Sequence, residues 1–236
     1  MLTLITGANG QLGKTIRSLV KQKKISSSFV FASRNQLDLS HLDHIQYFIE
    51  KHKFDLIINC AAYTAVDKAE VHEKEADLVN HLAVKKIAEV ALSNNIKLIH
   101  ISTDFVFDGL KHQPYFESDL TGPLNIYGNT KLAGENAVLS IMKFNAIIIR
   151  TSWVYSEYGN NFVDTILKLI QKGVDLNIVS DQIGTPTYAN DLGKAILSII
   201  ESKKFNATEQ ESQIYHYSNE GECNWYDFAN EIINIS

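Results

Sequence analysis

The chain opens with Leu2-Thr3-Leu4-Ile5-Thr6-Gly7-Ala8-Asn9-Gly10-Gln11-Leu12-Gly13. A short β-favouring run therefore meets a glycine turn, and a helical pattern follows through Val20. Strand, glycine turn and helix in this order place backbone N–H groups and the positive end of a helix where a pyrophosphate can bind. The spacing is G-x-x-G-x-x-G, and glycine turns also join strands to helices in proteins that bind no nucleotide. Both interpretations stay open at this point.

Further apolar runs repeat this alternation along the chain and predict buried strands. They are Phe29–Ala32, Leu56–Ala62, Leu98–Ile101, Asn145–Arg150 and Ile214–Tyr217. Helical segments separate them, the longest from about Lys74 to Asn94, and the last from Trp225 to Ile235. Alternating strands and helices predict an α/β fold, a doubly wound parallel sheet of the Rossmann-like kind, with ligands at the carboxyl ends of the strands.

The later part of the chain is looser in composition. We expect residues 1–155 to form the dinucleotide-binding core and residues 156–236 a small substrate lobe interleaved with the core's last strands and helices. Within the lobe, 181–187 reads as a polar loop, Asp191 as the cap of a helix that runs to about Ser202, and 203–213 as a mobile connection.

Composition excludes several classes of protein. A chain of 236 residues with 45% hydrophobic content can bury one substantial core. Its net charge of -5 is spread out with no basic stripe, which argues against nucleic-acid binding. No apolar run is long enough for a membrane span, and no leader precedes the first strand, so we expect a cytoplasmic protein. Cys60 and Cys223 are expected to be free thiols, and the histidines show no metal spacing.

The predicted cofactor site continues beyond the glycine turn. The second apolar run ends in Ser33-Arg34, about 20 residues past the turn, where a site for a free ribose 2′-hydroxyl carries Asp or Glu and where an Arg suits a 2′-phosphate. This favours NADPH, with NADH as the alternative, although an exposed loop arginine would look the same. In full, the expected cofactor contacts are Gly7, Asn9, Gly10, Gln11, Leu12, Arg34, Asp38, Leu39, Ala61, Ala62, Tyr63, Tyr127 and Lys131.

Candidate catalytic residues lie on two neighbouring segments. Thr103 follows the strand run at Leu98, while Tyr127 and Lys131 share one face of a predicted helix. A Thr103 hydroxyl would hold a carbonyl oxygen, Tyr127 would supply its proton and Lys131 would stabilise the tyrosinate. One charge at about 4 Å contributes roughly 4 kcal/mol at an effective dielectric near 20, so we expect Lys131 to bring the pKa of Tyr127 near neutrality.

The Tyr-x-x-x-Lys spacing has little specificity alone, because it also occurs at Tyr47 and Lys51. That second pair lies in a helical segment with no hydroxyl-bearing strand end before it. We therefore interpret Tyr47 and Lys51 as part of a surface helix.

Six ordered blocks together resemble the dTDP-4-dehydrorhamnose reductases, a family of extended short-chain dehydrogenase/reductases. The blocks are Gly7-x-x-Gly10-x-x-Gly13, residues 59–70, Ser102-Thr103-Asp104-x-Val106-Phe107-Asp108-Gly109, Tyr127-Gly128-x-x-Lys131-x-x-x-Glu135, Arg150-Thr151-Ser152-Trp153-Val154, and Asp181-Gln182-x-Gly184-x-Pro186-Thr187. The resemblance implies reduction of the 4-keto group of dTDP-4-dehydro-L-rhamnose by NADPH, the last step of dTDP-L-rhamnose synthesis. It makes Thr103, Tyr127 and Lys131 catalytic, and Thr64, Val66, Thr103, Asp104 and Trp153 substrate-binding.

The chain departs from the family pattern at three places. Position 105 is Phe where the family often has Tyr, which removes a hydroxyl near the substrate. Lys14-Thr15 stands where some members place a glutamate linked to a magnesium-bridged dimer, so we expect no metal and leave a homodimer open. The sequence given ends at Ser236, where the family continues, and we expect the substrate lobe to be incomplete.

Two other functions remain open at this stage. A non-catalytic relative, the regulatory subunit of methionine adenosyltransferase, resembles the same family, but the intact Thr103, Tyr127 and Lys131 argue against it. A nucleotide-sugar epimerase or dehydratase of the same superfamily is the second alternative, and it would retain bound NAD through purification.

Overall fold

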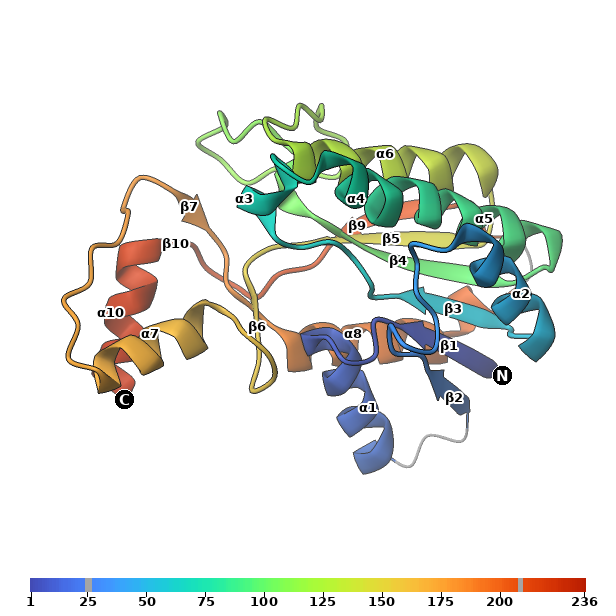
Figure 1. Cartoon of the computed structure of the whole chain (residues 1–236), viewed down its shortest axis with the longest axis horizontal. Helices are drawn as coiled ribbons and strands as arrows, with labels where there is room; N and C mark the ends of the chain where they lie inside the picture. The colour runs from blue at the N-terminus through green and yellow to red at the C-terminus, as the bar shows by residue number, and fades with distance from the viewer. Residues whose placement is uncertain (24–26, 208–209) are drawn as a thin grey trace.

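A six-stranded parallel sheet forms the centre of the protein in the computed structural model, which describes residues 1–23, 27–207 and 210–236 (Figure 1). Its strands are β1 (Leu2–Thr6), β2 (Ser28–Phe31), β3 (Leu56–Asn59), β4 (Lys97–Thr103), β5 (Ala146–Thr151) and β9 (Gln213–His216), in the order β2-β1-β3-β4-β5-β9. The strand order reverses direction between β1 and β3, and at such a point the carboxyl ends of the strands border a crevice. The predicted doubly wound α/β fold is confirmed.

Helices cover both faces of this sheet (Figure 1). On one face lie α2 (Leu42–His52), α5 (Ala83–Ser93) and α6 (Ile126–Ile141), and on the other α1 (Gln11–Lys23) and α8 (Ala189–Glu201). Residues such as Leu4 and Ile57 point to the first group, whereas the next residues along the same strands, Ile5 and Ile58, point to the second. The alternation along each strand therefore divides the core into two apolar layers.

The predicted long helix of residues 74–94 contains an irregular turn. It begins as α4 (Glu73–Asp77), passes through a π-helical turn over Leu78–Leu82 and continues as α5. Asn80 lies in this turn and is fully buried. Its side-chain oxygen accepts from the Tyr63 backbone N–H at 2.8 Å, and its amide donates to Thr130 Oγ1 at 3.2 Å. The extra residue of the π turn thus directs Asn80 between the end of β3 and α6.

The C-terminal part forms a second, smaller cluster to the left of the sheet in Figure 1. Helices α7 (Phe162–Gln171) and α10 (Trp225–Ile235) pack together around Ile166, Ala229 and Ile232. Beside them, β7 (Ile183–Gly184) pairs antiparallel with β10 (Cys223–Asn224), while β6 (Val154–Tyr155) pairs with β8 (Thr187–Tyr188). The segment 181–187, expected as a loop, therefore supplies two short strands. A division of the chain at residue 155 stays a prediction.

Two local expectations need correction. Helix α8 begins at Ala189, so Asp191 lies in its first turn and does not cap it; its carboxylate instead accepts hydrogen bonds from Lys194 and Asn219. The expected connection at 203–213 contains a short helix, α9 (Lys203–Asn206), and the start of β9, while residues 208–209 lie outside the described part. None of the helices in the described ranges is long and apolar enough to cross a membrane.

A buried ion pair joins α6 to β5. Arg150 Nη2 donates to Glu135 Oε2 at 2.7 Å, and Arg150 Nε donates to Oε1 at 3.0 Å. Both side chains are at most 5% exposed. The Phe107 ring lies 5.1 Å from the guanidinium carbon and covers it from water. Removing one partner would leave the other charge buried and uncompensated.

We expect Arg150→Met to lower the free energy of unfolding by about 3–5 kcal/mol, because the Glu135 carboxylate would lose both its charge partner and its hydrogen bonds. Urea titration followed by circular dichroism measures this. The matched control is Lys168→Met, which breaks the exposed pair with Asp164 and should cost less than about 1 kcal/mol. Equal losses in the two variants would show that burial does not strengthen the Arg150–Glu135 pair.

Candidate active site

The glycine turn is held tightly against the end of β3. Gly7 has φ +63, and a Cβ at this position would lie 2.8 Å from the Ala61 backbone nitrogen. Only glycine therefore permits this approach. Asn9 and Gly10 are exposed at the mouth of the turn, directly before α1 begins at Gln11. The backbone N–H groups at the start of α1 thus face the crevice between β1 and β3, where a pyrophosphate would be stabilised.

Two predicted cofactor residues use their side chains elsewhere. Gln11 Oε1 accepts from Ser156 Oγ and from Asn161 Nδ2, each at 3.0 Å, so its side chain ties the glycine turn to the segment before α7. Leu12 is 8% exposed and packs in the apolar layer below α1. Both residues can offer only backbone groups to a nucleotide.

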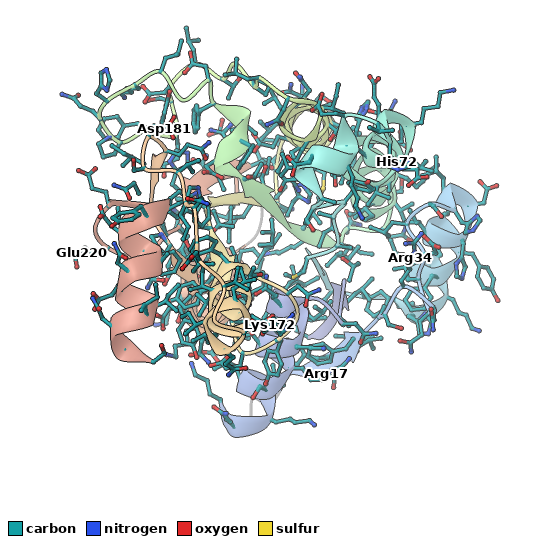
Figure 2. The ribbon with its side chains drawn as sticks, turned by 60° about the vertical axis from the view of Figure 1, so that its left-hand side comes forward. Arg17, Arg34, His72, Lys172, Asp181 and Glu220 are labelled. Atoms are coloured by element: carbon teal, nitrogen blue, oxygen red, sulfur yellow. The ribbon has the colours of Figure 1, made fainter. Side chains whose placement is uncertain are left out.

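The turn after β2 places Arg34 at the surface (Figure 2). Its side chain is 81% exposed, and its Nε lies 3.2 Å from Asp38 Oδ2. Asp38 also accepts from the Ser40 backbone N–H at 2.9 Å, which is the main reason that its pKa is lowered. Leu39 is 4% exposed and belongs to the core, so its side chain supports the turn. Arg34 is positioned where an anion could displace Asp38 from its guanidinium.

The end of β3 is fixed by polar groups on both sides. The Ala61 N–H donates to Thr6 Oγ1 at 3.3 Å, and Asn80 bonds both the N–H and the carbonyl of Tyr63. Ala61, Ala62 and Tyr63 are half-buried along this segment. Their small or flat side chains leave the backbone accessible to a planar ligand.

Thr103 and Tyr127 meet at the carboxyl end of β4. Thr103 ends this strand, and Tyr127 lies in the first turn of α6, whose N-terminus is capped by the Asn125 side chain at 2.7 Å from the Gly128 N–H. A Cβ on Gly128 would lie 2.2 Å from the Phe105 carbonyl oxygen, so only glycine lets α6 start this close to β4. Thr103 Oγ1 donates to Asp104 Oδ1 at 3.0 Å and accepts from the Phe105 N–H.

The pKa of Tyr127 moves opposite to our expectation. Burial raises the pKa of Tyr127 to about 12, and the Asp104 carboxylate adds to the rise, while the Thr103 hydroxyl opposes it. Within the part of the chain that the structure describes, no hydrogen bond joins Lys131 to Tyr127. The expectation was wrong because it counted one favourable charge and left out the loss of solvent around a phenol that is 9% exposed. At neutral pH, Tyr127 therefore holds its proton.

Lys131 is buried between α6 and β4. It is 2% exposed, and its Nζ donates to the Ile101 carbonyl at 2.7 Å. Burial lowers the pKa of Lys131 to about 8, although the nearby Glu135 carboxylate acts in the opposite direction. Lys131 follows Tyr127 by one helical turn, as the spacing predicted.

The second Tyr-x-x-x-Lys pair is a surface feature, as predicted. Tyr47 is 62% exposed on α2, with Lys51 Nζ 5.7 Å from its ring centre. The two pairs share a spacing but differ in burial, and only Tyr127 lies next to a strand-end hydroxyl.

The predicted substrate residues surround the same strand ends. Thr64 is exposed before the short helix α3 (Val66–Ala69), and Val66 packs against the small apolar cluster that contains Tyr127. Burial raises the pKa of Asp104 to about 6. Trp153 follows β5, but one face of its indole stacks on Trp225, with ring centres 3.5 Å apart. That face is therefore closed to a ligand in this arrangement.

Several residues that shape the site were not predicted from the sequence. Glu70 Oε1 accepts from the Ile126 N–H at 2.8 Å at the start of α6. His100 lies beside Lys131, and Asn59 contacts the other side of the His100 ring; both are almost fully buried. Asn59 and His100 both lie within predicted strands. Because neighbouring parallel strands pair residue by residue, polar side chains on adjacent strands can come together, and this was the available signal.

Both cysteines are free, as expected, and both are half-buried. Burial raises the pKa of Cys60 to about 12, so its thiol is protonated at neutral pH. Within residues 1–23, 27–207 and 210–236, no group of three His, Cys, Asp or Glu side chains is arranged to hold a metal ion.

The fold and these residues define a class of protein. A doubly wound sheet with a glycine turn after β1, a strand-end hydroxyl after β4 and a Tyr-x-x-x-Lys pair at the start of the next helix is the arrangement of extended short-chain dehydrogenase/reductases. The family model of the RmlD substrate binding domain matches residues 1–236, and the chain belongs to this family.

Individual relatives agree with this assignment. The chain is 40% identical to a dTDP-4-dehydrorhamnose reductase of Aggregatibacter actinomycetemcomitans over 230 residues, which are 96% of this chain and 76% of the relative. It is 36% identical to a dTDP-4-keto-6-deoxy-D-glucose reductase of Streptomyces niveus, over 96% of this chain and 75% of the relative. The crystal structure of a dTDP-4-dehydrorhamnose reductase from Bacillus anthracis in complex with NADP superposes with a TM-score of 0.90 at 36% identity, over 99% of this chain and 80% of that one.

We expect Lys131→Met to be more stable than the wild type at neutral pH. Because burial lowers the pKa of Lys131 from 10.5 to about 8, the folded state is destabilised by a charged ammonium, on the order of 1–3 kcal/mol. This penalty is fully present below about pH 8, where Lys131 is charged in both states, and it disappears as the pH rises past 10.5. Urea titrations at several pH values measure the difference.

The control for this prediction is Lys168→Met, which exchanges an exposed lysine for the same residue. Its effect should be small and should not depend on pH in this range. A Lys131→Met protein that is less stable than the wild type at neutral pH would contradict the prediction.

Proposed function

We propose that this protein uses NADPH to reduce the 4-keto group of dTDP-4-dehydro-L-rhamnose. The observation that carries the proposal is the protonated, buried Tyr127 phenol beside the Thr103 hydroxyl, at the same edge of the sheet as the glycine turn. The names of the relatives, and the NADP bound by the B. anthracis protein, support the choice of substrate class and cofactor.

The residues at the crevice fit a dinucleotide. A Cβ on Gly7 would fill the space against Ala61, the N-terminus of α1 is open above it, and Arg34 offers a cation to a 2′-phosphate. Backbone groups of Gly7, Asn9, Gly10, Gln11 and Leu12 would hold the pyrophosphate. Ala61, Ala62 and Tyr63 would lie along the nicotinamide half, with Asp38 and Leu39 at the adenine end. When bound, NADPH supplies the hydride.

In the proposed mechanism, side chains of the protein polarise the substrate carbonyl oxygen and supply its proton. The Thr103 hydroxyl, whose backbone is fixed at the end of β4, would turn its proton from Asp104 Oδ1 to the carbonyl oxygen and polarise it. Tyr127 then gives its proton to the oxygen as negative charge develops there. The Lys131 ammonium, one turn along α6, stabilises the tyrosinate and restores its proton. Thr64, Val66, Asp104 and Trp153 would border the sugar nucleotide.

The precise 4-keto sugar is the finer part of the proposal. A relative at 36% identity is named for dTDP-4-keto-6-deoxy-D-glucose, so this sugar is the second candidate. Phe105 is one position that bears on the choice, because its ring lies edge-on to Tyr127 at 5.5 Å and offers no hydroxyl to the substrate. Comparing kcat/KM for the two dTDP sugars decides between them. A cytoplasmic location and a homodimer stay predictions.

We expect Tyr127→Phe to lower kcat at least about a hundredfold, because the change removes the general acid and keeps the ring that packs against Phe105 and Val66. NADPH oxidation with dTDP-4-dehydro-L-rhamnose measures the rate. Tyr47→Phe is the matched control, since it removes an exposed phenol at the same spacing from a lysine, and it should keep the wild-type rate. An active Tyr127→Phe protein would rule out this mechanism.

We expect Arg34→Ala to weaken NADPH binding and to leave NADH binding nearly unchanged. The contact is exposed, so the loss should be modest, roughly threefold to tenfold. Fluorescence titration of both cofactors measures it. Lys172→Ala removes another exposed cation, after α7, and should change neither affinity (Figure 2). If the ratio of the two affinities is the same in Arg34→Ala and the wild type, Arg34 does not recognise the 2′-phosphate.

A further inference from the structure

A chain of buried hydrogen bonds runs across three strands to Lys131. The Ala61 N–H donates to Thr6 Oγ1 at 3.3 Å, and Thr6 Oγ1 lies 2.5 Å from Asn59 Oδ1. Asn59 Nδ2 lies 3.1 Å from His100 Nδ1, and His100 Nε2 lies 3.4 Å from Lys131 Nζ. Strand pairing sets these neighbours, because Thr6 is in register with Asn59, and Asn59 with His100.

The direction of these hydrogen bonds is fixed at one end. A backbone N–H can only donate, so Thr6 Oγ1 accepts from Ala61 and uses its own proton toward Asn59. The 2.5 Å separation suits an O–H···O bond and is too short for an N–H···O bond, which places the amide oxygen of Asn59 on the Thr6 side. The Asn59 NH₂ group therefore faces His100 and donates to Nδ1. With Nδ1 as an acceptor, the neutral imidazole carries its proton on Nε2.

The doubly protonated form of His100 is energetically unfavourable in this environment. It is 0% exposed, and both burial and the nearby Lys131 charge lower the pKa of His100 well below its usual value. The Nε2–H consequently points toward the Lys131 amine in the neutral ring. A neutral amine accepts such a hydrogen, whereas an ammonium carries only donors and is repelled.

The other ionisable groups around Lys131 do not cancel this effect. From α6, Glu135 faces it but is already held by Arg150 of β5, and Tyr127 is protonated. Cys60, after β3, is a neutral thiol. Asp104, after β4, raises the pKa of Tyr127 and is not among the groups that shift the pKa of Lys131.

We propose that His100 is a positioning residue, locked by Thr6 and Asn59 in its Nε2–H tautomer, that favours the neutral form of Lys131 and makes its ammonium a readier proton donor. This deepens the proposed function and rests on it for its catalytic meaning. In the reaction, the Tyr127 O–H bond breaks as its proton passes to the substrate oxygen. The tyrosinate then takes a proton from the Lys131 ammonium, and the amine regains one from water. One proton from solvent is consumed per turnover, and the imidazole itself gives up none.

The tautomer is measured directly by ¹⁵N NMR of histidine-labelled protein, in which protonated and unprotonated ring nitrogens have distinct shifts. The His100 signals are assigned by their loss in His100→Phe. We expect Nε2 protonated and Nδ1 unprotonated throughout the range in which surface histidines titrate. An Nδ1–H tautomer or an imidazolium would overturn the proposal, whether or not the protein proves to be a reductase.

Two variants of β1 test whether Thr6 fixes the tautomer of His100. Thr6→Val removes the hydroxyl that orients Asn59, and Thr3→Val removes an equally buried hydroxyl of the same strand. We expect Thr6→Val to populate the Nδ1–H tautomer of His100 and Thr3→Val to leave the Nε2–H tautomer alone. An unchanged tautomer in Thr6→Val would show that Thr6 plays no part in the lock.

The effect on Lys131 is read from the ¹³Cε shift of this lysine, assigned by its loss in Lys131→Arg. His100→Phe keeps a buried ring and removes the Nε2–H, so the titration midpoint of Lys131 should rise by about one pH unit or more. His52→Phe makes the same exchange on α2 and should leave the midpoint unchanged. An unchanged or lower midpoint in His100→Phe would overturn the proposal. Because this readout needs no turnover, its failure is distinct from a failure to reduce the dTDP sugar, which would instead contradict the proposed function.

Discussion

The close approach of α6 to the end of β4 is the constraint on which the site depends. Gly128 leaves room for the Phe105 carbonyl, where a Cβ would come within 2.2 Å of that oxygen. This approach puts Tyr127 beside Thr103 and drives the Lys131 side chain into the interior, where Ile101 and His100 meet it. An ammonium taken out of water loses solvation that the hydrogen bond to the Ile101 carbonyl restores only in part. The ammonium form of Lys131 is therefore less stable than that of an exposed lysine.

Two buried cations on neighbouring elements show what decides their charge state. Arg150 has a bidentate carboxylate partner in Glu135, and a guanidinium stays protonated at any physiological pH. Among the described residues, Lys131 forms no ion pair, and its Nζ contacts the Ile101 carbonyl and the His100 imidazole; its pKa falls to about 8. Since Glu135 is committed to Arg150, it cannot fully stabilise Lys131. The ion pair thus stabilises the fold, and in the proposed mechanism it also leaves Lys131 able to exchange a proton.

Much of the fold could be predicted because its signals are local. Apolar strand runs, the turn at Gly7 and the one-turn spacing of Tyr127 and Lys131 are all visible within a few residues. The buried chain from Thr6 to His100 was not, since it requires the strand order and register, which no short segment contains. The π turn at Asn80 inserts one residue without a mark in the hydrophobic pattern. The pKa of Tyr127 was predicted in the wrong direction for a different reason. The Tyr-x-x-x-Lys spacing indicates that the two side chains are close, but it does not indicate that the phenol is shielded from solvent.

The environment of Trp153 limits what its side chain could offer to the proposed sugar substrate. Its φ of 45° lies in the left-handed region, a conformation that costs a non-glycine residue on the order of 1–2 kcal/mol. Stacking on Trp225 and packing against Gly184, where a Cβ would lie 2.5 Å from the indole, offset that cost. With one face occupied, Trp153 can offer a substrate only the remaining part of its ring. Trp225 begins α10 and stacks on Trp153, so the packing of the small lobe fixes the position of the Trp153 indole. A change in the packing of α10 should therefore also displace Trp153.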